Sequence, residues 1–188
     1  MSHFRLSILI PTLPERATFL KRLRVMLDPQ LVGQPVEILL DDRPRPITTG
    51  AKRNALLARA SGDYVAFVDD DDLVSAHYVR DVLKALEDSP DCAELRGIIT
   101  VDGRNPKDFH HTIHCEKWEE RNGVYLRYCN HLNAIRRELA LQAGFPEKNH
   151  GEDKEFSDRV KPLLRTMGEV PSVLYLYQSR TRKPEMAH

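Results

Sequence analysis

Short apolar runs alternate with helix-like segments through the first half of the chain. The apolar runs predict buried strands over residues 6–10, 36–40 and 64–68. Apolar residues at helical spacing predict helices over residues 15–27 and 48–60, and a further helix that Ser75 caps and that ends near Ser89. Strand followed by helix, three times in succession, predicts a mostly parallel sheet with helices on both faces.

The second half of the chain is less regular. Its pattern predicts strands over residues 95–101 and 173–177, an extended stretch over 126–135, and helices over 137–143 and 152–164. Residues 102–121 are polar, carry several histidines and match neither period. Because the chain shows no internal repeat and no linker, we expect a single α/β domain, a mostly parallel sheet flanked by helices, over residues 4–178. A polar C-terminal tail follows over residues 179–188.

Composition limits the binding partners and the cellular location that we expect for the protein. The 188 residues, 41% of them hydrophobic, suit one packed core. Lys and Arg together number 28, as do Asp and Glu, so bulk charge does not indicate a nucleic-acid partner. The three cysteines show no paired metal-ligand spacing and are expected to be reduced thiols. The apolar stretch near the N-terminus is too short for a signal peptide or a membrane span, so we expect a cytoplasmic protein without one.

Polar residues stand where the three predicted strands end. Thr12 follows the first strand, Asp41 and Asp42 end the second, and four consecutive aspartates, residues 69–72, follow the third. In parallel α/β sheets, ligands bind beyond the carboxyl ends of the strands. Four adjacent carboxylates repel one another, and a divalent cation such as Mg²⁺ or Mn²⁺ relieves that repulsion and bridges them to phosphates. The alternative is a solvated acidic loop whose last residue, Asp72, caps the next helix.

Three blocks of the chain carry a family resemblance. They are residues 7–12 with 37–42, residues 52–72 from Lys52-Arg53-Asn54 to the acidic run, and residues 150–159 around Glu152-Asp153. In order and spacing they resemble family 2 glycosyltransferases with the GT-A fold, in a small, soluble version. The resemblance implies transfer of a sugar from a nucleoside-diphosphate sugar, most often UDP-linked, with Mn²⁺ or Mg²⁺ as the cofactor.

The resemblance also implies roles for individual residues. Pro11 and Thr12 would approach the nucleotide from the first strand, and Asp41 or Asp42 would accept a hydrogen bond from the base. Arg53 and Asn54 would lie on the helix beside the nucleotide, where Arg53 either contacts phosphate or pins the acidic loop.

The acidic run contains the family's Asp-x-Asp spacing. Asp69 would point toward the ribose and the metal, Asp71 toward the metal, and Asp70 fills the variable position beside the nucleotide. A histidine near the last strand sometimes completes the metal shell in such enzymes. Residues 174–179 contain none, so a water or no ligand at all would take that place.

The pair Glu152-Asp153 supplies the candidate catalytic base. Attack on an anomeric carbon needs a carboxylate that takes the proton of the acceptor hydroxyl. An acidic first helical turn is the alternative explanation of the pair. The resemblance favours catalysis, with Asp153 ahead of Glu152, and a single base without a nucleophile implies inversion. The acceptor could be a glycan, a small molecule or a modified nucleic acid, and the oligomeric state is open.

Two other functions compete with sugar transfer. A module that binds a sugar nucleotide without turnover would keep the same pocket. A nucleotidyltransferase would also use carboxylates and metal, but it needs a glycine-rich loop after the first strand, and Pro11-Thr12-Leu13-Pro14 has no glycine.

The middle of the chain offers a further group of candidates. The histidines at positions 110, 111, 114 and 131 match no usual zinc spacing, so a zinc site is disfavoured. Trp118, Tyr125 and Tyr128 form either an acceptor wall or ordinary packing. The basic residues 180–183 either fold over the diphosphate or stay solvated.

Overall fold

Three parallel strands form the centre of the first sheet in the computed structural model, which describes residues 4–180. Strand β1 (Leu6–Pro11) lies between β2 (Val36–Asp41) and β3 (Tyr64–Phe67), with Leu6 opposite Val36 on one side and Tyr64 on the other. Short strands extend the sheet in the order β11-β5-β10-β3-β1-β2. These are β5 (Cys92–Ala93), antiparallel β10 (Ile135–Arg136) and β11 (Met167–Gly168). The predicted α/β fold with a largely parallel sheet is confirmed.

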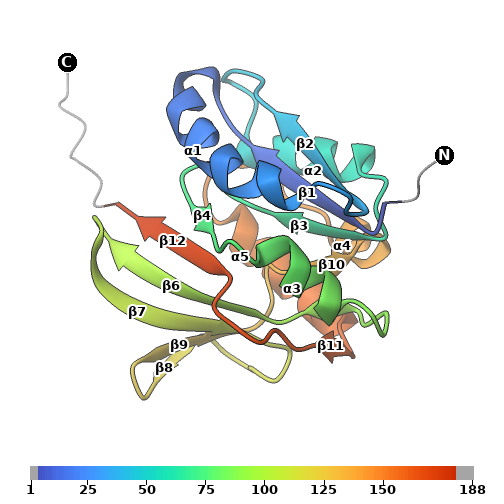
Figure 1. Ribbon diagram of the computed structural model, residues 1–188, viewed down its shortest axis with the longest axis vertical. Coiled ribbons are helices and arrows are strands. Elements are labelled where there is room, and N and C mark those ends of the chain that lie inside the picture. Colours follow the sequence, from blue (N-terminus) through green and yellow to red (C-terminus); the bar gives the residue numbers. More distant parts are fainter. Residues whose placement is uncertain (1–3, 181–188) are drawn as a thin grey trace.

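Helices cover both faces of this sheet (Figure 1). Because side chains of a strand alternate, Ile8 and Ile10 of β1 face one core and Leu9 faces the other. Helices α1 (Ala17–Leu27) and α3 (Tyr78–Ala85) pack into the first core. Helices α2 (Thr49–Arg59), α4 (Arg137–Ala143) and α5 (Glu152–Val160) pack into the second. Short 3₁₀ turns occupy Pro14–Arg16, Asp28–Gln30 and Lys161–Leu163.

Two helix starts test the capping predictions. For the helix predicted over residues 48–60 the sequence left the cap open between Thr48 and Thr49. Helix α2 begins after Thr48, whose hydroxyl accepts a hydrogen bond from the Ala51 N–H at 3.2 Å. The cap predicted at Ser75 is wrong. Residues before it form strand β4 (Leu73–Val74), which pairs with the last strand, and the helix starts only at Tyr78.

A second sheet was not foreseen. Its order is β4-β12-β6-β7-β9-β8, built from β6 (Leu95–Val101), β7 (Arg104–His111), β8 (Glu119–Arg121), β9 (Val124–Arg127) and β12 (Tyr175–Ser179). Leu95, Phe109 and Tyr175 pack it against the first core. The polar segment over residues 102–121, left unassigned, therefore contains all of β7 and β8, and the extended stretch predicted over 126–135 divides into part of β9, a loop and the start of β10.

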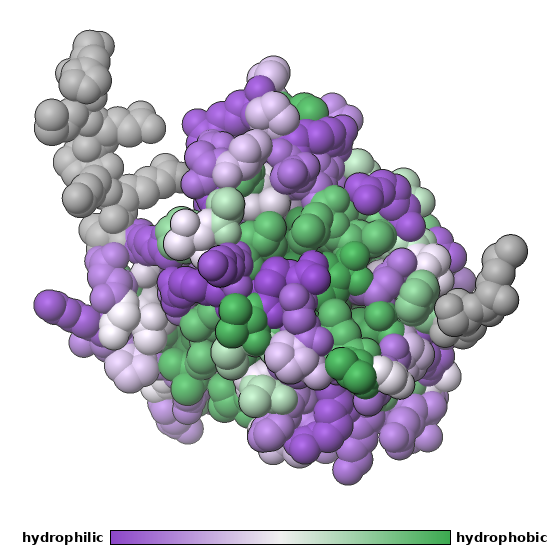
Figure 2. Space-filling model, turned by 45° about the horizontal axis from the view of Figure 1, so that its top comes forward, coloured by the Kyte–Doolittle hydropathy of each residue, from purple (hydrophilic) through white to green (hydrophobic). Residues whose placement is uncertain are grey.

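One face of the protein has an apolar region at its middle. Apolar side chains gather across the middle of one face and hydrophilic ones surround them (Figure 2). Within residues 4–180, none of the helices combines the length and apolar character needed to cross a bilayer. Ser179, assigned to the predicted tail, belongs to β12, and residues 181–188 of that tail lie outside the described residues.

Candidate active site

A large cavity of about 970 Å³ opens at the carboxyl ends of the parallel strands. Its walls come from the ends of β1 and β3, the start of α2 and the loop before α5. The lining residues that matter below are Pro11, Thr12, Arg16, Arg45, Ile47, Thr49, Lys52, Arg53, Asp69, Asp70, Asp71, Asn149, His150 and Glu152. This is the position that the strand ends predicted for a ligand.

The acidic run divides into two outward and two inward carboxylates. The side chains of Asp69 and Asp71 keep 24% and 27% of their surface exposed, whereas Asp70 and Asp72 are buried. Asp70 accepts a hydrogen bond from the Thr12 hydroxyl at 2.5 Å and one from Arg16 Nε at 3.0 Å. The Oδ1 atom of Asp71 lies 2.9 Å from Arg16 Nη2. One arginine thus holds two members of the run.

Asp72 does not cap a helix. Its carboxyl oxygens contact the Tyr175 hydroxyl at 2.9 Å and accept the Gln178 N–H at 2.7 Å, so it fastens the acidic loop to β12. Burial, and then the nearby Asp69, raises the pKa of Asp72 to about 8. Burial would also raise the pKa of Asp69, but Arg53 and then His131 lower it well below its usual range.

Arg53 is the buried link between the acidic run and α5. Its Nη2 donates to Asp69 Oδ1 at 2.9 Å, its Nη1 lies 3.7 Å from Glu152 Oε1, and its guanidinium lies 5.5 Å from the Phe145 ring centroid. Its Nε and Nη1 have no hydrogen-bond partner among the described residues. Arg53 therefore pins the acidic loop, and two of its buried nitrogen atoms have no hydrogen-bond acceptor among the described residues.

Replacing Arg53 with methionine is expected to lower the free energy of unfolding by about 3 kcal/mol, because two carboxylates would lose their buried cation. Urea denaturation measures this loss. Arg59→Met, on the exposed side of the same helix, is the control and should change stability by less than about 0.5 kcal/mol. Equal unfolding midpoints for the two variants would contradict the linking role of Arg53.

The loop that carries Asn149 and His150 is held over the start of α2. A Cβ on Gly50 would lie 1.8 Å from the Pro146 carbonyl oxygen, so only glycine permits this approach. The Thr49 N–H donates to Asn149 Oδ1 at 3.0 Å. Asn54 exchanges two 2.8 Å hydrogen bonds with the Phe145 backbone and does not line the cavity. Its amide thus positions this loop.

Asp41 and Asp42, predicted to contact the base of the nucleotide, lie at the end of β2 and apart from the cavity lining. Asp41 is buried and accepts hydrogen bonds from the backbone N–H and the Nε of Arg43, at 3.2 and 2.9 Å. Asp42 is exposed, and neither carboxylate lines the cavity. The following residues Arg45 and Ile47 line it instead. A base contact from Asp41 or Asp42 stays a prediction.

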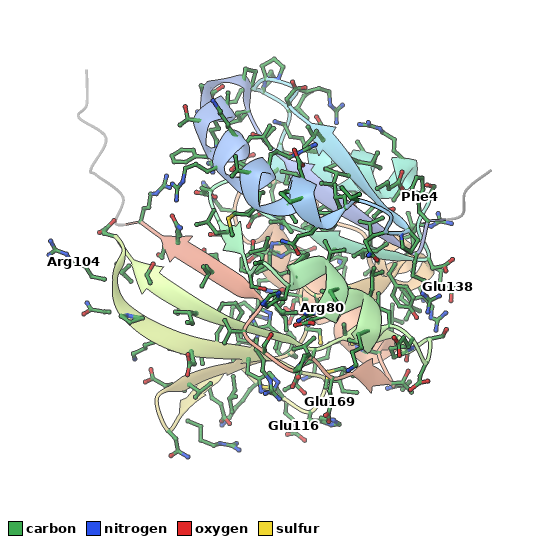
Figure 3. All side chains as sticks on the ribbon, viewed as in Figure 1. Phe4, Arg80, Arg104, Glu116, Glu138 and Glu169 are labelled. Atoms are coloured by element: carbon green, nitrogen blue, oxygen red, sulfur yellow. The ribbon has the colours of Figure 1, made fainter. Side chains whose placement is uncertain are left out.

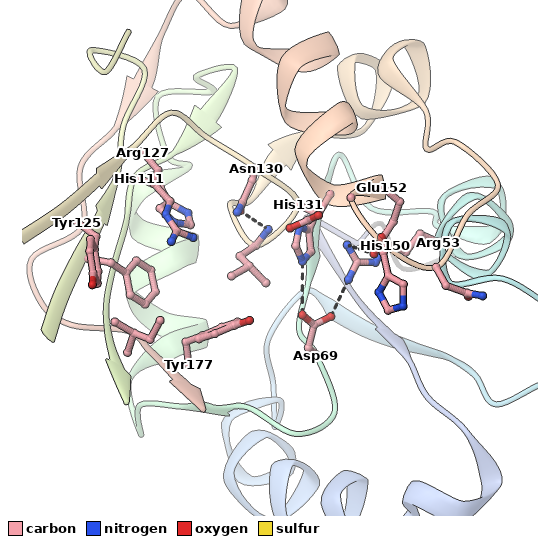
Figure 4. A pocket seen from close by; sticks show the side chains of 16 residues that line it. Arg53, Asp69, His111, Tyr125, Arg127, Asn130, His131, His150, Glu152 and Tyr177 are labelled. Carbon is pink, nitrogen blue, oxygen red and sulfur yellow. Dashed lines mark hydrogen bonds and ion pairs between the residues drawn. The ribbon is translucent and has the colours of Figure 1, made fainter. Parts of the chain in front are cut away.

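A smaller cavity of about 250 Å³ adjoins the larger one. The two share Arg53, Asp69, Asn149, His150 and Glu152. The second sheet supplies the opposite wall, with Ile99, Phe109, His111, Tyr125, Arg127 and Tyr177 (Figure 4). Asp153 lines only the smaller cavity. The predicted base thus lies in one chamber, the metal candidate Asp71 lies in the other, and Asp69 borders both.

The histidines at positions 110, 111 and 131 have different partners and surroundings. His110 pairs with Glu94, whereas His111 and His131 line the smaller cavity, where His131 Nε2 lies 3.5 Å from Asp69 Oδ2. Within residues 4–180 no three His, Cys, Asp or Glu side chains are grouped to hold a metal by themselves. A hard cation that shares its shell with substrate phosphates needs only one or two protein carboxylates, and Asp69 with Asp71 fits that role.

His111 is a neutral histidine with a defined tautomer. The Asn133 amide donates to the Ala93 carbonyl at 2.9 Å, so its oxygen faces His111 Nδ1 at 3.3 Å, and that nitrogen carries the proton. Burial, and then the charge of Arg127, lowers the pKa of His111 to about 3. The Nε2 atom is therefore left as an acceptor.

His111→Gln is expected to reduce the acid sensitivity of folding. Below pH 6.5 the unfolded chain takes up a proton that the folded His111 does not, so stability falls as pH drops toward 3. Between pH 8 and pH 5 this residue accounts for about 2 kcal/mol of lost stability. Chemical denaturation at both pH values measures the difference, and His77→Gln, at an exposed position, is the control. An unchanged pH dependence in His111→Gln would contradict the buried neutral state.

Several lining residues were missed by sequence reasoning. Arg16 stands five positions past the end of β1, and the rule that selected Thr12 would have selected it too. Arg127 and Tyr177 reach the site only because the second sheet packs beside the first. Of the proposed aromatic wall, Tyr125 lines the smaller cavity, whereas Trp118 and Tyr128 pack together outside its lining, with ring centroids 5.8 Å apart.

Comparison with known proteins identifies the class and then the family. The fold is similar to two structures of residues 1–349 of S. aureus TarS. One is in complex with UDP-GlcNAc, at 17% identity and a TM-score of 0.65, covering 98% of this chain and 62% of that one. The other is in complex with UDP, at 16% identity and a TM-score of 0.65, covering 93% and 60%. The fold is thus the GT-A fold of glycosyltransferases, and the chain spans about three fifths of the TarS fragment. A search of curated proteins gave no match.

The family follows from the sequence match. The family described as "Glycosyl transferase family 2" matches residues 30–142, more than half of the chain. This chain belongs to glycosyl transferase family 2.

Proposed function

We propose that the chain is a metal-dependent, inverting glycosyltransferase that moves a sugar from a nucleoside-diphosphate sugar to an acceptor hydroxyl. The observation that carries this proposal is the pair of adjoining cavities, which share Arg53, Asp69 and Glu152. A donor in the larger cavity and an acceptor in the smaller one would meet at these shared residues.

The larger cavity suits the donor. Pro11, Thr12, Asp69 and Asp70 line it from two strand ends, and the guanidinium groups of Arg16 and Arg53 add positive charge for a phosphate. UDP is the favoured nucleotide, because the TarS structures hold UDP-GlcNAc and UDP. The base contacts of Asp41 or Asp42, and a nucleotide contact of Asn54, stay predictions, since none of these residues lines the cavity.

Asp71 and Asp69 would hold the metal, Mn²⁺ or Mg²⁺. When bound, the cation would stabilise the negative charge that develops on the departing diphosphate. Arg16, which bridges Asp70 and Asp71, keeps the acidic loop closed while it also faces the cavity. The protein supplies two carboxylates, and the phosphates supply further oxygens.

Asp153 would act as the catalytic base. Glu152 is buried and its Oε1 lies 3.7 Å from Arg53 Nη1, whereas Asp153 is half-buried and lines the acceptor side. A carboxylate there can take the proton of the attacking hydroxyl as the sugar leaves the diphosphate. One base without a nucleophile gives inversion at the anomeric carbon.

The acceptor could be a glycan, a small molecule or a modified nucleic acid. A cytoplasmic location is supported by the cysteines: all three are buried free thiols, and the sulfur atoms of Cys92 and Cys129 lie 3.8 Å apart without a bond.

UDP release from a panel of UDP-sugars and GDP-sugars, with water as the acceptor, tests the proposal. We expect slow release from at least one UDP-sugar with Mn²⁺ or Mg²⁺, and none with EDTA. Metal-dependent binding without release would indicate a binding module instead. Neither binding nor release of any nucleotide sugar would contradict the proposal outright.

A further inference from the structure

The wall that the second sheet gives to the smaller cavity carries a single ionised side chain. Five of its six residues are Ile99, Phe109, Tyr125, Tyr177 and the neutral His111. The sixth, Arg127, is a cation at the end of β9, directly opposite His111 in the register of β7 and β9. Figure 4 shows Arg127 and His111 together, on the side of the cavity away from Arg53.

Arg127 is held in place without a carboxylate partner. Its guanidinium carbon lies 4.7 Å from the Trp118 ring centroid and 6.0 Å from that of Tyr125. No carboxylate of residues 4–180 forms an ion pair with it. The neighbouring acidic side chains form ion pairs with other cations: Glu119 with Arg121, Glu120 with Lys107 and Asp158 with Lys154.

A half-buried guanidinium without a counter-charge is costly to keep unless a ligand supplies one. Contact with aromatic rings uses none of its N–H donors as hydrogen bonds, so the fork can bind a planar or tetrahedral anion. The adjacent His111 Nε2 can accept a hydrogen bond from a ligand hydroxyl, and Tyr125 and Tyr177 offer aromatic faces of the kind that pack against sugar rings. The chamber thus combines an anion donor, a hydroxyl acceptor and aromatic faces.

From this combination we infer that the acceptor is an anionic sugar unit, bearing a carboxylate or a phosphate, and that Arg127 selects it. This inference rests on the proposed function, because it assigns the smaller cavity to the acceptor. Its volume of about 250 Å³ holds a small end group rather than an extended ligand. Arg127 would bind the anion at the second-sheet wall, and the reacting hydroxyl would lie toward Asp153.

Calorimetric titration of the full chain, with UDP and Mn²⁺ present, tests this inference. The probes are a hexuronate, a hexose 6-phosphate and an uncharged methyl hexoside. At least one anionic probe should bind about tenfold or more tightly than the methyl hexoside. The stronger of the two anionic probes shows whether carboxylate or phosphate is preferred. Arg127→Gln should remove the difference, and Arg127→Lys, which keeps the charge but loses the fork, should keep part of it.

The control is Arg104→Gln, because Arg104 is exposed at the β6–β7 hairpin and points away from the protein (Figure 3). It should bind the probes as the unchanged protein does. Equal affinity for charged and uncharged probes, no binding of either anion at millimolar concentration, or unchanged anion binding in Arg127→Gln would each overturn the inference. UDP release with water as the acceptor is measured in parallel. If release persists while anion selectivity is absent, only the acceptor assignment fails.

Discussion

Asp153→Asn is expected to slow UDP release by about 10²–10⁴-fold, the usual contribution of a general base. The substrate is the UDP-sugar that the unchanged protein hydrolyses. Asparagine has nearly the same shape but cannot take a proton from the attacking hydroxyl or water. Because Asp153 lines only the smaller cavity, UDP affinity in the larger one should change little. Steady-state release and a UDP titration together separate chemistry from binding.

The matched control lies on the same helix. Asp158 is exposed, pairs with Lys154 and lines neither cavity, so Asp158→Asn should leave the release rate within about twofold of the unchanged protein. Near-normal release by Asp153→Asn would exclude Asp153 as the base. If Glu152→Gln then stopped release without unfolding the chain, Glu152 would take the role.

Asp71→Asn should abolish the metal dependence of nucleotide binding. Asp71 keeps about a quarter of its side chain exposed to the larger cavity, and Arg16 is its partner in an ion pair. With Mn²⁺, we expect UDP affinity to fall by about 100-fold, about 2.7 kcal/mol, because a cation that bridges carboxylate and diphosphate loses a protein ligand. Without metal, the affinities of the variant and of the unchanged protein should be similar.

Glu15 provides the control variant for Asp71→Asn. Glu15 lies in the 3₁₀ turn after β1, is exposed and does not line the larger cavity. Glu15→Gln removes one negative charge near the same strand end and should keep the Mn²⁺ effect. An Mn²⁺ effect of full size in Asp71→Asn would show that the acidic run does not hold the metal.

The parallel part of the fold was readable from sequence because its signals are local. Each of β1, β2 and β3 is a short, mostly apolar run, and the acidic run begins two residues after the end of β3. The second sheet depends on pairing between distant segments. Strand β7 reads RNPKDFHH, and only Phe109 and His111 of it are buried, so its pattern gives little sign of a strand. The hairpin turns at Asp102-Gly103 and Asn122-Gly123, both with positive φ, were the overlooked signal.

For the site too, local sequence patterns predicted some residues, whereas others depend on how distant segments pack. The strand-end rule selected the acidic run, and the family resemblance selected Asp69 and Asp71 within it; both line the larger cavity. The sequence left Arg53 between a phosphate contact and an ion pair. The structure forms the ion pair with Asp69 and places Arg53 Nη1 3.7 Å from Glu152 Oε1 as well. Arg127 could not be foreseen, because its place depends on how the second sheet packs against the first.

A crystal structure of this chain with UDP and Mn²⁺ tests the central claim most directly. The account predicts the nucleotide in the larger cavity, with the diphosphate and the metal beside Asp69 and Asp71, and the smaller cavity free for an acceptor next to Asp153. Nucleotide bound outside the larger cavity, or manganese held by residues other than Asp69 and Asp71, would contradict it.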